Sequence, residues 1–379
     1  MVAGFLQRGS SQTGSNMFDR FRNVLRRTKR YAFAFYTINK NRLMGRTFVP
    51  LPLKRLFIEP VSFCNLACKF CTYPKNLHAR AVMEESLFRK SIDQASHLGI
   101  REIVLTPING DVFMDKNIIP RMHYIEASRI KSFAFYTNFV GADEPMIAAL
   151  LTMKKCRYAE ISLYGHDLDS FRNITGRGEA QFNRLARNLR TLEQCLKSKP
   201  KHMEIGIAFR TYRSFSLESE PGNELLSIVR RLYANGVKVS SSSLVDNWGG
   251  DVTQEDIAGI QMDLTEGHHL YRKGPCGLPF DSLQVTATGK VNACACRDPR
   301  GTLTLGDLRF QQLSDIISSR NKKWLKLIED QDAGRFNDVC ASCGFYQSIH
   351  DERRIQAFQE TGETGVISKE EFVSRMDIS

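Results

Sequence analysis

The chain of 379 residues has no long hydrophobic run and no recognisable secretion signal. Its longest apolar stretch, residues 31–38, is far too short to cross a bilayer. The ten cysteines do not resemble a disulfide framework either, because eight of them fall into metal-like groups or beside one. We therefore expect a soluble globular protein of the reducing cytoplasm.

Acidic residues are almost missing from the first 55 positions. This stretch holds twelve Lys or Arg and one acid, Asp19, which gives it 12 − 1 = +11 of the total net charge of +12. The remainder of the chain is nearly neutral, so the basic character belongs to an N-terminal arm. A general affinity for nucleic acid is not indicated.

Within this arm the spacing of Phe18, Phe21 and Leu25, with arginines between them, predicts a basic amphipathic helix. Such a helix could lie on an anionic membrane surface or hold an acidic partner. The alternative is that it packs on the main domain and leaves its arginines in solvent. The sequence leaves these alternatives open.

Beyond Pro52 strand-like and helix-like segments alternate, which is typical of a parallel β/α architecture. The strand candidates are residues 55–63, 101–106, 131–138, 158–165, 202–210 and 237–245. The helix candidates between them are residues 84–98, 115–128, 144–153, 180–196 and 223–234. Six strands of this kind predict an incomplete barrel.

Three cysteines follow the first strand candidate with the spacing CxxxCxxC: Cys64, Cys68 and Cys71. A short loop with three thiolates can hold three irons of a [4Fe–4S] cube and leaves the fourth iron open. An incomplete zinc knuckle is the alternative, but zinc prefers CxxC pairs and four ligands. The spacing therefore favours an iron–sulfur site with one open iron.

This motif resembles that of the radical S-adenosylmethionine (radical SAM) superfamily. In that family the open iron binds the methionine moiety, and an electron from the cluster cleaves S-adenosylmethionine to a 5′-deoxyadenosyl radical. The resemblance implies a partial (β/α)6 barrel of TIM type with its site at the carboxyl ends of the strands. The three cysteines do follow a predicted strand, which agrees with that arrangement.

The resemblance also indicates residues that would contact S-adenosylmethionine. Phe70 stands where the family has an aromatic side chain near the adenine, and Asn109-Gly110-Asp111 where it has Gly-Gly-Glu-Pro. Asp111 would accept hydrogen bonds from the methionine ammonium, although it is shorter than Glu and no proline follows; an ordinary turn is the alternative. Further candidates at later strand ends are Asn138, Ser162, Gly206 and Asn247. The neighbouring Trp248 would border the adenine or the substrate, or close the base of the barrel.

A second set of cysteines follows the barrel: Cys276, Cys294, Cys340 and Cys343. Between the first two, residues 282–287 and 290–296 predict a hairpin around Thr288-Gly289. This layout resembles the SPASM/Twitch extension of radical SAM enzymes, which binds auxiliary iron–sulfur clusters. Four cysteines would fully ligate one [4Fe–4S] cluster, as in Twitch, whereas full SPASM domains have more cysteines. Cys296 would be a further ligand or a hydrogen-donating thiol, and a zinc ribbon is the alternative for the whole set.

Together these motifs predict an α/β protein: a partial (β/α)6 TIM-type barrel with a small C-terminal hairpin and helix domain for the second iron–sulfur site. We expect a basic, partly disordered arm with an amphipathic helix over residues 1–50 and the radical SAM barrel over residues 51–255. The auxiliary cluster domain would span residues 270–350, and a tail residues 351–379.

The resemblance implies reductive cleavage of S-adenosylmethionine and removal of a substrate hydrogen. One auxiliary cluster resembles the layout of radical dehydrogenases of aminoglycoside biosynthesis, which predicts a two-electron oxidation of a carbohydrate or aminocyclitol-like substrate. A peptide-modifying SPASM maturase and a radical epimerase are the alternatives. A non-catalytic lipid- or partner-binding barrel would be expected to have lost a cluster cysteine, and none is missing.

The expected partners follow from this chemistry. They are a small-molecule or glycan substrate that could be anionic, and an electron donor such as flavodoxin or ferredoxin. The basic arm adds an expected peripheral contact with the inner face of the membrane. No run of residues identifies the substrate itself.

Overall fold

The structure, a computed structural model, describes residues 17–49, 53–75, 77–198, 202–213, 215–217, 222–265, 272–295, 297–350 and 365–376. Its centre is a set of parallel strands: β2 (Arg55–Ile58), β3 (Glu102–Leu105), β4 (Ser132–Thr137), β5 (Cys156–Tyr164), β6 (Glu204–Arg210) and β7 (Lys238–Ser242). They pair in the order of the sequence, so each crossover returns the chain to the neighbouring strand. All six predicted strands are confirmed, and they form the partial (β/α)6 barrel.

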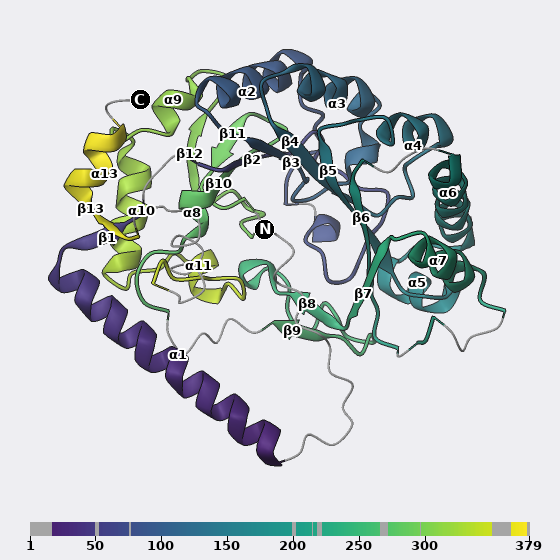
Figure 1. Cartoon of the computed structure of the whole chain (residues 1–379), viewed down its shortest axis with the longest axis horizontal. Coiled ribbons are helices and arrows are strands. Elements are labelled where there is room, and N and C mark those ends of the chain that lie inside the picture. The colour runs from purple at the N-terminus through teal and green to yellow at the C-terminus, as the bar shows by residue number, and fades with distance from the viewer. Residues whose placement is uncertain are drawn as a thin grey trace.

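Helices cover the outer face of these strands (Figure 1). They are α2 (Glu85–His97), α3 (Ile118–Ala127), α4 (Glu144–Leu150), α5 (Leu168–Thr175), α6 (Glu179–Ser198) and α7 (Glu224–Ala234). On β5, alternate residues such as Ile161 and Leu163 are buried beneath them. The apolar strand faces and helix stripes thus share one core.

Helix α5 was not predicted from the sequence. Asp167 accepts a hydrogen bond from Ser170 N, Ser170 bonds back to the Asp167 backbone, and Gly176 ends the helix in the left-handed conformation. This cap pattern is visible in the sequence, but eight residues are too few for a clear helical period. The helix matters to the site, because Ile174 and Thr175 accept hydrogen bonds from the loop that carries the first cysteines.

The predicted hairpin is confirmed in the strands β10 (Ser282–Val285) and β11 (Lys290–Asn292), which are antiparallel. It continues the barrel sheet, because β10 pairs with β2 in parallel and β11 pairs with β12 (Thr304–Asp307). In the described part of the chain the sheet has nine strands, in the order β12-β11-β10-β2-β3-β4-β5-β6-β7. The auxiliary segment and the barrel are therefore joined by a continuous hydrogen-bonded ladder.

Short elements complete the region after the barrel. A small sheet joins β8 (Leu244–Asp246) to β9 (Asp263–Thr265). The helices that follow are α8 (Leu278–Asp281), α9 (Leu313–Ile316), α10 (Lys322–Asp332) and α11 (Asp338–Ser342). One-turn helices also lie within the barrel, at η1 (Tyr73–Lys75) and η2 (Val112–Met114), and after it at η3 (Trp248–Gly250).

The segment that follows α1 pairs with a segment near the C-terminus, beside α10. Strand β1 (Arg46–Phe48) pairs with β13 (Ile367–Ser368), which leads into α13 (Lys369–Met376). The buried ring of Phe48 packs against Phe280 and Phe372, with ring centroids 6.4 and 4.8 Å away. The arm and the tail that the sequence set apart thus contribute to the core of the auxiliary region.

The predicted basic helix is present as α1 (Met17–Leu43), which is attached at its C-terminal end (Figure 1). No helix in the described part of the chain has both the length and the apolar character needed to span a bilayer.

Candidate active site and auxiliary cysteine site

The loop after β2 carries Cys64, Cys68 and Cys71 at the carboxyl edge of the parallel sheet. It is fixed by backbone hydrogen bonds of 2.9 Å from Ala67 N and Lys69 N to the end of α5. Cys68 is buried and the other two are partly buried. Backbone N–H groups of Leu66 and Tyr73 lie 3.4 Å from the sulfurs of Cys64 and Cys71. Donors aimed at sulfur are typical of iron–sulfur ligands.

Burial raises the pKa of all three thiols, and for Cys68 the neighbouring thiols raise it further. Each cysteine must therefore lose its proton when iron binds. Among the described residues, no three His, Cys, Asp or Glu side chains converge as ligands of one metal ion. Cysteines of a cluster bind different irons, so this site does not require such convergence.

The segment Asn109-Gly110-Asp111 packs directly against the cysteine loop. Thr72 Oγ1 donates to Asn109 Oδ1 at 2.6 Å, and Asp111 N donates to Phe63 O at 3.1 Å. A Cβ on Gly110 would lie 2.6 Å from Val61 O, so only glycine fits there. The glycine thus permits a close approach to the chain's own backbone, and a contact with methionine stays a prediction.

The buried carboxylate of Asp111 already has protein partners. It accepts hydrogen bonds from Phe113 N at 3.0 Å, Asn138 N at 2.6 Å and Thr137 Oγ1 at 2.9–3.0 Å. Burial raises its pKa, while these donors oppose the shift. A carboxylate offers about four acceptor positions, so three donors leave room for about one more. The methionine ammonium remains the predicted fourth donor.

Asn138 contacts the first cysteine itself. Its Nδ2 lies 3.4 Å from Cys64 Sγ and 2.8 Å from Asn65 Oδ1, while its Oδ1 accepts from Val140 N at 2.9 Å. The structure therefore places this residue, predicted near S-adenosylmethionine, beside a predicted iron ligand. A hydrogen bond to a ligand sulfur raises the reduction potential of a cluster.

We expect Asn138→Leu to lower the reduction potential of the cluster held by Cys64, Cys68 and Cys71. Losing one hydrogen bond of ~1 kcal/mol corresponds to a shift of ~40 mV for a one-electron couple. A redox titration followed by electron paramagnetic resonance measures it, and the second cluster serves as an internal control. An unchanged potential would show that the 3.4 Å contact carries no hydrogen bond in the loaded protein.

Glu59 is a buried acid that the sequence analysis did not select. Its carboxylate accepts from Ile108 N at 3.1 Å on one side and from Ala287 N at 3.0 Å on the other. Burial raises its pKa. It joins the loop before Asn109 to the hairpin of the auxiliary region. The signal available was an acid directly after the apolar residues 56–58.

The inner face of β5 is polar. On β5, Tyr158, Glu160, Ser162 and Tyr164 alternate with buried apolar residues and remain partly accessible. Tyr158 Oη donates to Glu160 at 2.8 Å, and a Cβ on Gly206 would lie 2.7 Å from that hydroxyl. Gly206 therefore makes room for Tyr158, while its predicted role beside the adenine is not tested. Ser162 lies on this inner face, as its predicted ribose contact requires.

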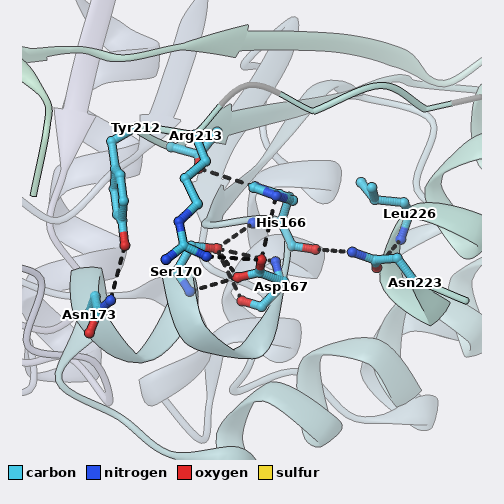
Figure 2. Close-up of polar contacts among 9 residues, drawn as sticks. His166, Asp167, Ser170, Asn173, Tyr212, Arg213, Asn223 and Leu226 are labelled. Atoms are coloured by element: carbon cyan, nitrogen blue, oxygen red, sulfur yellow. Dashed lines mark hydrogen bonds and ion pairs between the residues drawn. The ribbon is translucent and has the colours of Figure 1, made fainter. Parts of the chain in front are cut away.

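A further polar group follows the carboxyl ends of β5 and β6 (Figure 2). Asp167 caps α5 and lies 3.5 Å from Arg213 Nη1, and His166 lies 3.3 Å from Thr211 Oγ1. The buried His166 ring also stacks on Phe215 at 4.9 Å. These bonds order the strand ends, and Arg213 leaves an exposed cation at the same edge as the cysteine loop.

The second cysteine set surrounds one cavity. Its lining includes all four predicted ligands, Cys276, Cys294, Cys340 and Cys343. Gln331 Nε2 lies 3.4 Å from Cys340 Sγ, and Phe345 N lies 3.2 Å from Cys343 Sγ. Burial raises the pKa of Cys340 to about 12 and that of Cys343 to about 11. Cysteines separated by up to 67 residues of sequence thus surround the same cavity and could bind one cluster. The predicted further candidate, Cys296, lies outside the described residues.

The segment from Asp246 to Gly250 lies between the two cysteine sites. Trp248 Nε1 donates to Phe70 O at 2.9 Å, next to Cys71. Asn247 bonds to Ser342 O at 2.7 Å and to Gly344 N at 3.3 Å, on either side of Cys343. Trp248 therefore lies at the carboxyl edge and does not close the base of the barrel. Asn247 contacts the auxiliary site, and its cofactor contact stays a prediction.

Phe70 packs beside the barrel interior, since its ring lies 5.4 Å from that of Tyr164. Ala295, the residue after Cys294, packs with Phe57, Val104 and Tyr136 on the inner face. The two cysteine loops thus approach the barrel interior from its mouth.

Residues 276–344, which contain the complete second cysteine set, match the family model SPASM, described as an iron–sulfur cluster-binding domain. This match favours iron–sulfur binding over the zinc alternative. Together with the CxxxCxxC loop and the barrel, it makes the chain similar to one enzyme class. The chain resembles the radical SAM enzymes that carry a SPASM domain. Its cofactors are therefore S-adenosylmethionine and [4Fe–4S] clusters.

Solved structures of this enzyme class are similar to the chain. Streptococcus suis SuiB bound to precursor peptide SuiA is 16% identical with a TM-score of 0.51, covering 90% of this chain and 79% of that one. BtrN in complex with AdoMet and 2-DOIA is 17% identical, with a TM-score of 0.47 and coverage of 78% and 94%. Native anSMEcpe with bound AdoMet and Cp18Cys peptide is 13% identical, with a TM-score of 0.46 and coverage of 86% and 96%. At these identities the likeness concerns the fold, and no curated protein matches the sequence.

Proposed function

We propose that this radical SAM enzyme oxidises a polar small molecule of the carbohydrate or aminocyclitol type by two electrons, converting an alcohol to a carbonyl. Cys64, Cys68 and Cys71 would hold the first cluster, and Cys276, Cys294, Cys340 and Cys343 the second. When bound, these groups and S-adenosylmethionine supply the one-electron chemistry that removes a substrate hydrogen and accepts the remaining electron.

The observation that carries the proposal is the cavity lined by the four cysteines of the second set. Four protein ligands leave no iron open for a substrate, so the second site suits electron transfer. Its Cys294 loop is close to the barrel interior, because Ala295 packs against Tyr136. A two-electron oxidation requires an acceptor for the second electron of the substrate, and a cluster at this place would be close enough to accept it.

The polar side chains of β5 on the inner face support a substrate with hydroxyl or amino groups. Glu160, held by Tyr158 at 2.8 Å, would accept the proton of the alcohol or bind a substrate ammonium. With hydrogen removed as an atom, the loss of this proton and one electron completes the change from CH–OH to C=O. The exposed guanidinium of Arg213 at the same edge would favour an anionic group on the substrate.

The test uses deuterated aminocyclitols and sugars with the anaerobically reconstituted holoenzyme and S-adenosylmethionine. We expect one substrate to raise 5′-deoxyadenosine formation, to transfer its deuterium into that product, and to yield one oxidised product per 5′-deoxyadenosine. The control is the Cys64→Ala variant, which lacks a predicted ligand of the first cluster and should not remove hydrogen from the substrate. A product of unchanged oxidation level would favour an epimerase, and a response to peptides alone would favour a maturase; either result would overturn the proposal.

The remaining partners follow from the same reaction. A flavodoxin or ferredoxin would supply the electron that starts each cycle, and the cluster sites would require a reducing, cytoplasmic setting. Reduction of the holoenzyme by purified flavodoxin in place of dithionite tests the first of these.

A further inference from the structure

Helix α1 is attached to the body of the enzyme at its C-terminal end. Ile38 is buried, Asn41 Nδ2 lies 3.0 Å from His350 Nδ1, and Arg42 bonds to the carbonyl of Asp332. Figure 1 shows the helix as a long rod that leaves the domain at β1. Ile38, Asn41 and Arg42 are spaced as neighbours on one helix face, so this face is the one attached.

A different face of α1 is apolar and exposed. Leu25, Ala32, Tyr36 and Leu43 recur at intervals of seven, four and seven residues, which places them in one line along the helix. All four are exposed, with Tyr36 at 63% and Leu43 at 90% of their full accessibility. Phe35 lies beside this line and is 55% exposed. The described side chains of this line are thus left to solvent by the enzyme's own fold.

Cations accompany this apolar line. Lys29 and Lys40 are exposed and lie within about 60° of it around the helix axis, as their sequence positions require. The whole helix contains eight Lys or Arg and one Asp, a net charge of 8 − 1 = +7. A second copy of the enzyme is a poor occupant for this face, because two such helices would repel each other.

We propose that α1 docks the enzyme on an anionic lipid surface, lying in the plane of the interface with the line of Leu25, Ala32, Tyr36 and Leu43 in the headgroup region. An apolar stripe flanked by lysines is the arrangement of an interfacial helix, in which lysine side chains reach anionic headgroups while the apolar side chains enter the acyl boundary. The helix is amphipathic and charged and does not qualify as a bilayer span, which fits a peripheral contact. This inference does not depend on the reaction proposed above.

The experiment is co-sedimentation of the full-length holoenzyme with phosphatidylcholine vesicles that contain 30% phosphatidylglycerol, and with vesicles of phosphatidylcholine alone. We expect binding to the anionic vesicles at low salt and its loss in high salt, where charges are screened. Lys29→Glu with Lys40→Glu should weaken binding at least about 30-fold, because the loss of the two cations alone is equivalent to ~2 kcal/mol at ~1 kcal/mol per cation. Leu25→Ser with Tyr36→Ser should weaken it about tenfold or more.

Point variants are preferred to deletion of the arm, because Phe48 of the same segment is part of the core. The matched control reverses two exposed lysines of α10, Lys322→Glu with Lys323→Glu, and should bind as the unaltered enzyme does. The proposal is overturned if the enzyme stays in the supernatant at low salt, if neutral vesicles bind it equally, or if the α10 control loses as much binding as the α1 variants. It is also overturned if light scattering shows a self-association that the Leu25/Tyr36 variant abolishes while vesicle binding is unchanged.

Discussion

Replacing Cys64, Cys68 and Cys71 together with alanine is expected to remove about half of the iron and to abolish S-adenosylmethionine cleavage. The reconstituted enzyme should hold about eight irons, since two [4Fe–4S] clusters contain four each. The variant should keep about four, because the second cysteine set lines a separate cavity. Iron analysis, together with 5′-deoxyadenosine formation under dithionite, measures both effects.

A cysteine outside both sets provides the control for this experiment. Cys195 of α6 is partly exposed and belongs to neither site, so Cys195→Ala should keep all the iron and full cleavage. If the triple variant held zinc in place of iron, the assignment of an iron–sulfur cluster to the second cysteine set would be wrong. Iron near zero would mean that the two sites assemble only together, through contacts such as that of Trp248 with Phe70.

Most strands of the barrel were predictable because each is a short apolar run followed by a helical segment, whereas β7 consists mainly of serine. All six appear in the predicted order; five are shorter than predicted, and β5 begins two residues earlier, at Cys156. The first strand was predicted to extend to residue 63, but β2 ends at Ile58. Pro60 follows two residues later and has no N–H group to donate to the hydrogen-bond ladder of the sheet. The local sequence pattern therefore predicted that each strand exists better than it predicted where the strand begins and ends.

The pairing of β10 with β2 was not predictable from the sequence. These strands lie more than 220 residues apart and pair in parallel, so no turn between them indicates the contact. Glu59 reinforces this pairing by accepting from Ala287 N, and its role appears only when three distant segments are placed together. Long-range register of this kind depends on packing over the whole domain.

The candidate site shows the same division between local and distant information. The cysteine spacing located the first loop, because CxxxCxxC is a local signal. The structure places the four cysteines of the second set around one cavity, although only Cys340 and Cys343 are close in sequence. The family pattern did not reveal that Asp111 is held by Phe113, Thr137 and Asn138, or that Asn247 faces the auxiliary loop. Resemblance to a family motif predicts at which strand end a residue lies. The hydrogen-bond partners of its side chain depend on neighbouring loops, which the motif does not describe.

The enzyme with Cys340→Ala and Cys343→Ala is expected to cleave S-adenosylmethionine and yet to lose oxidised product. The first cysteine loop is fixed by β2, α5 and Asn138, and none of these contacts involves the altered residues. Without the second cluster, the substrate that has lost a hydrogen atom has no nearby acceptor for its remaining electron. The ratio of 5′-deoxyadenosine to oxidised product should therefore rise by at least about tenfold, which mass spectrometry of both products measures.

A purely structural role of the second site predicts a different pattern. The auxiliary hairpin shares the sheet with β2, and Glu59 connects it to the loop before Asn109. If the second cluster only supported these contacts, its loss would weaken S-adenosylmethionine binding and lower cleavage and oxidation together. Ser342→Ala lies between the two altered cysteines and leaves both sulfurs in place, so it controls for disturbance of α11. Cleavage that continues without oxidation in the cysteine variant, with both activities retained in Ser342→Ala, is the pattern of an electron acceptor.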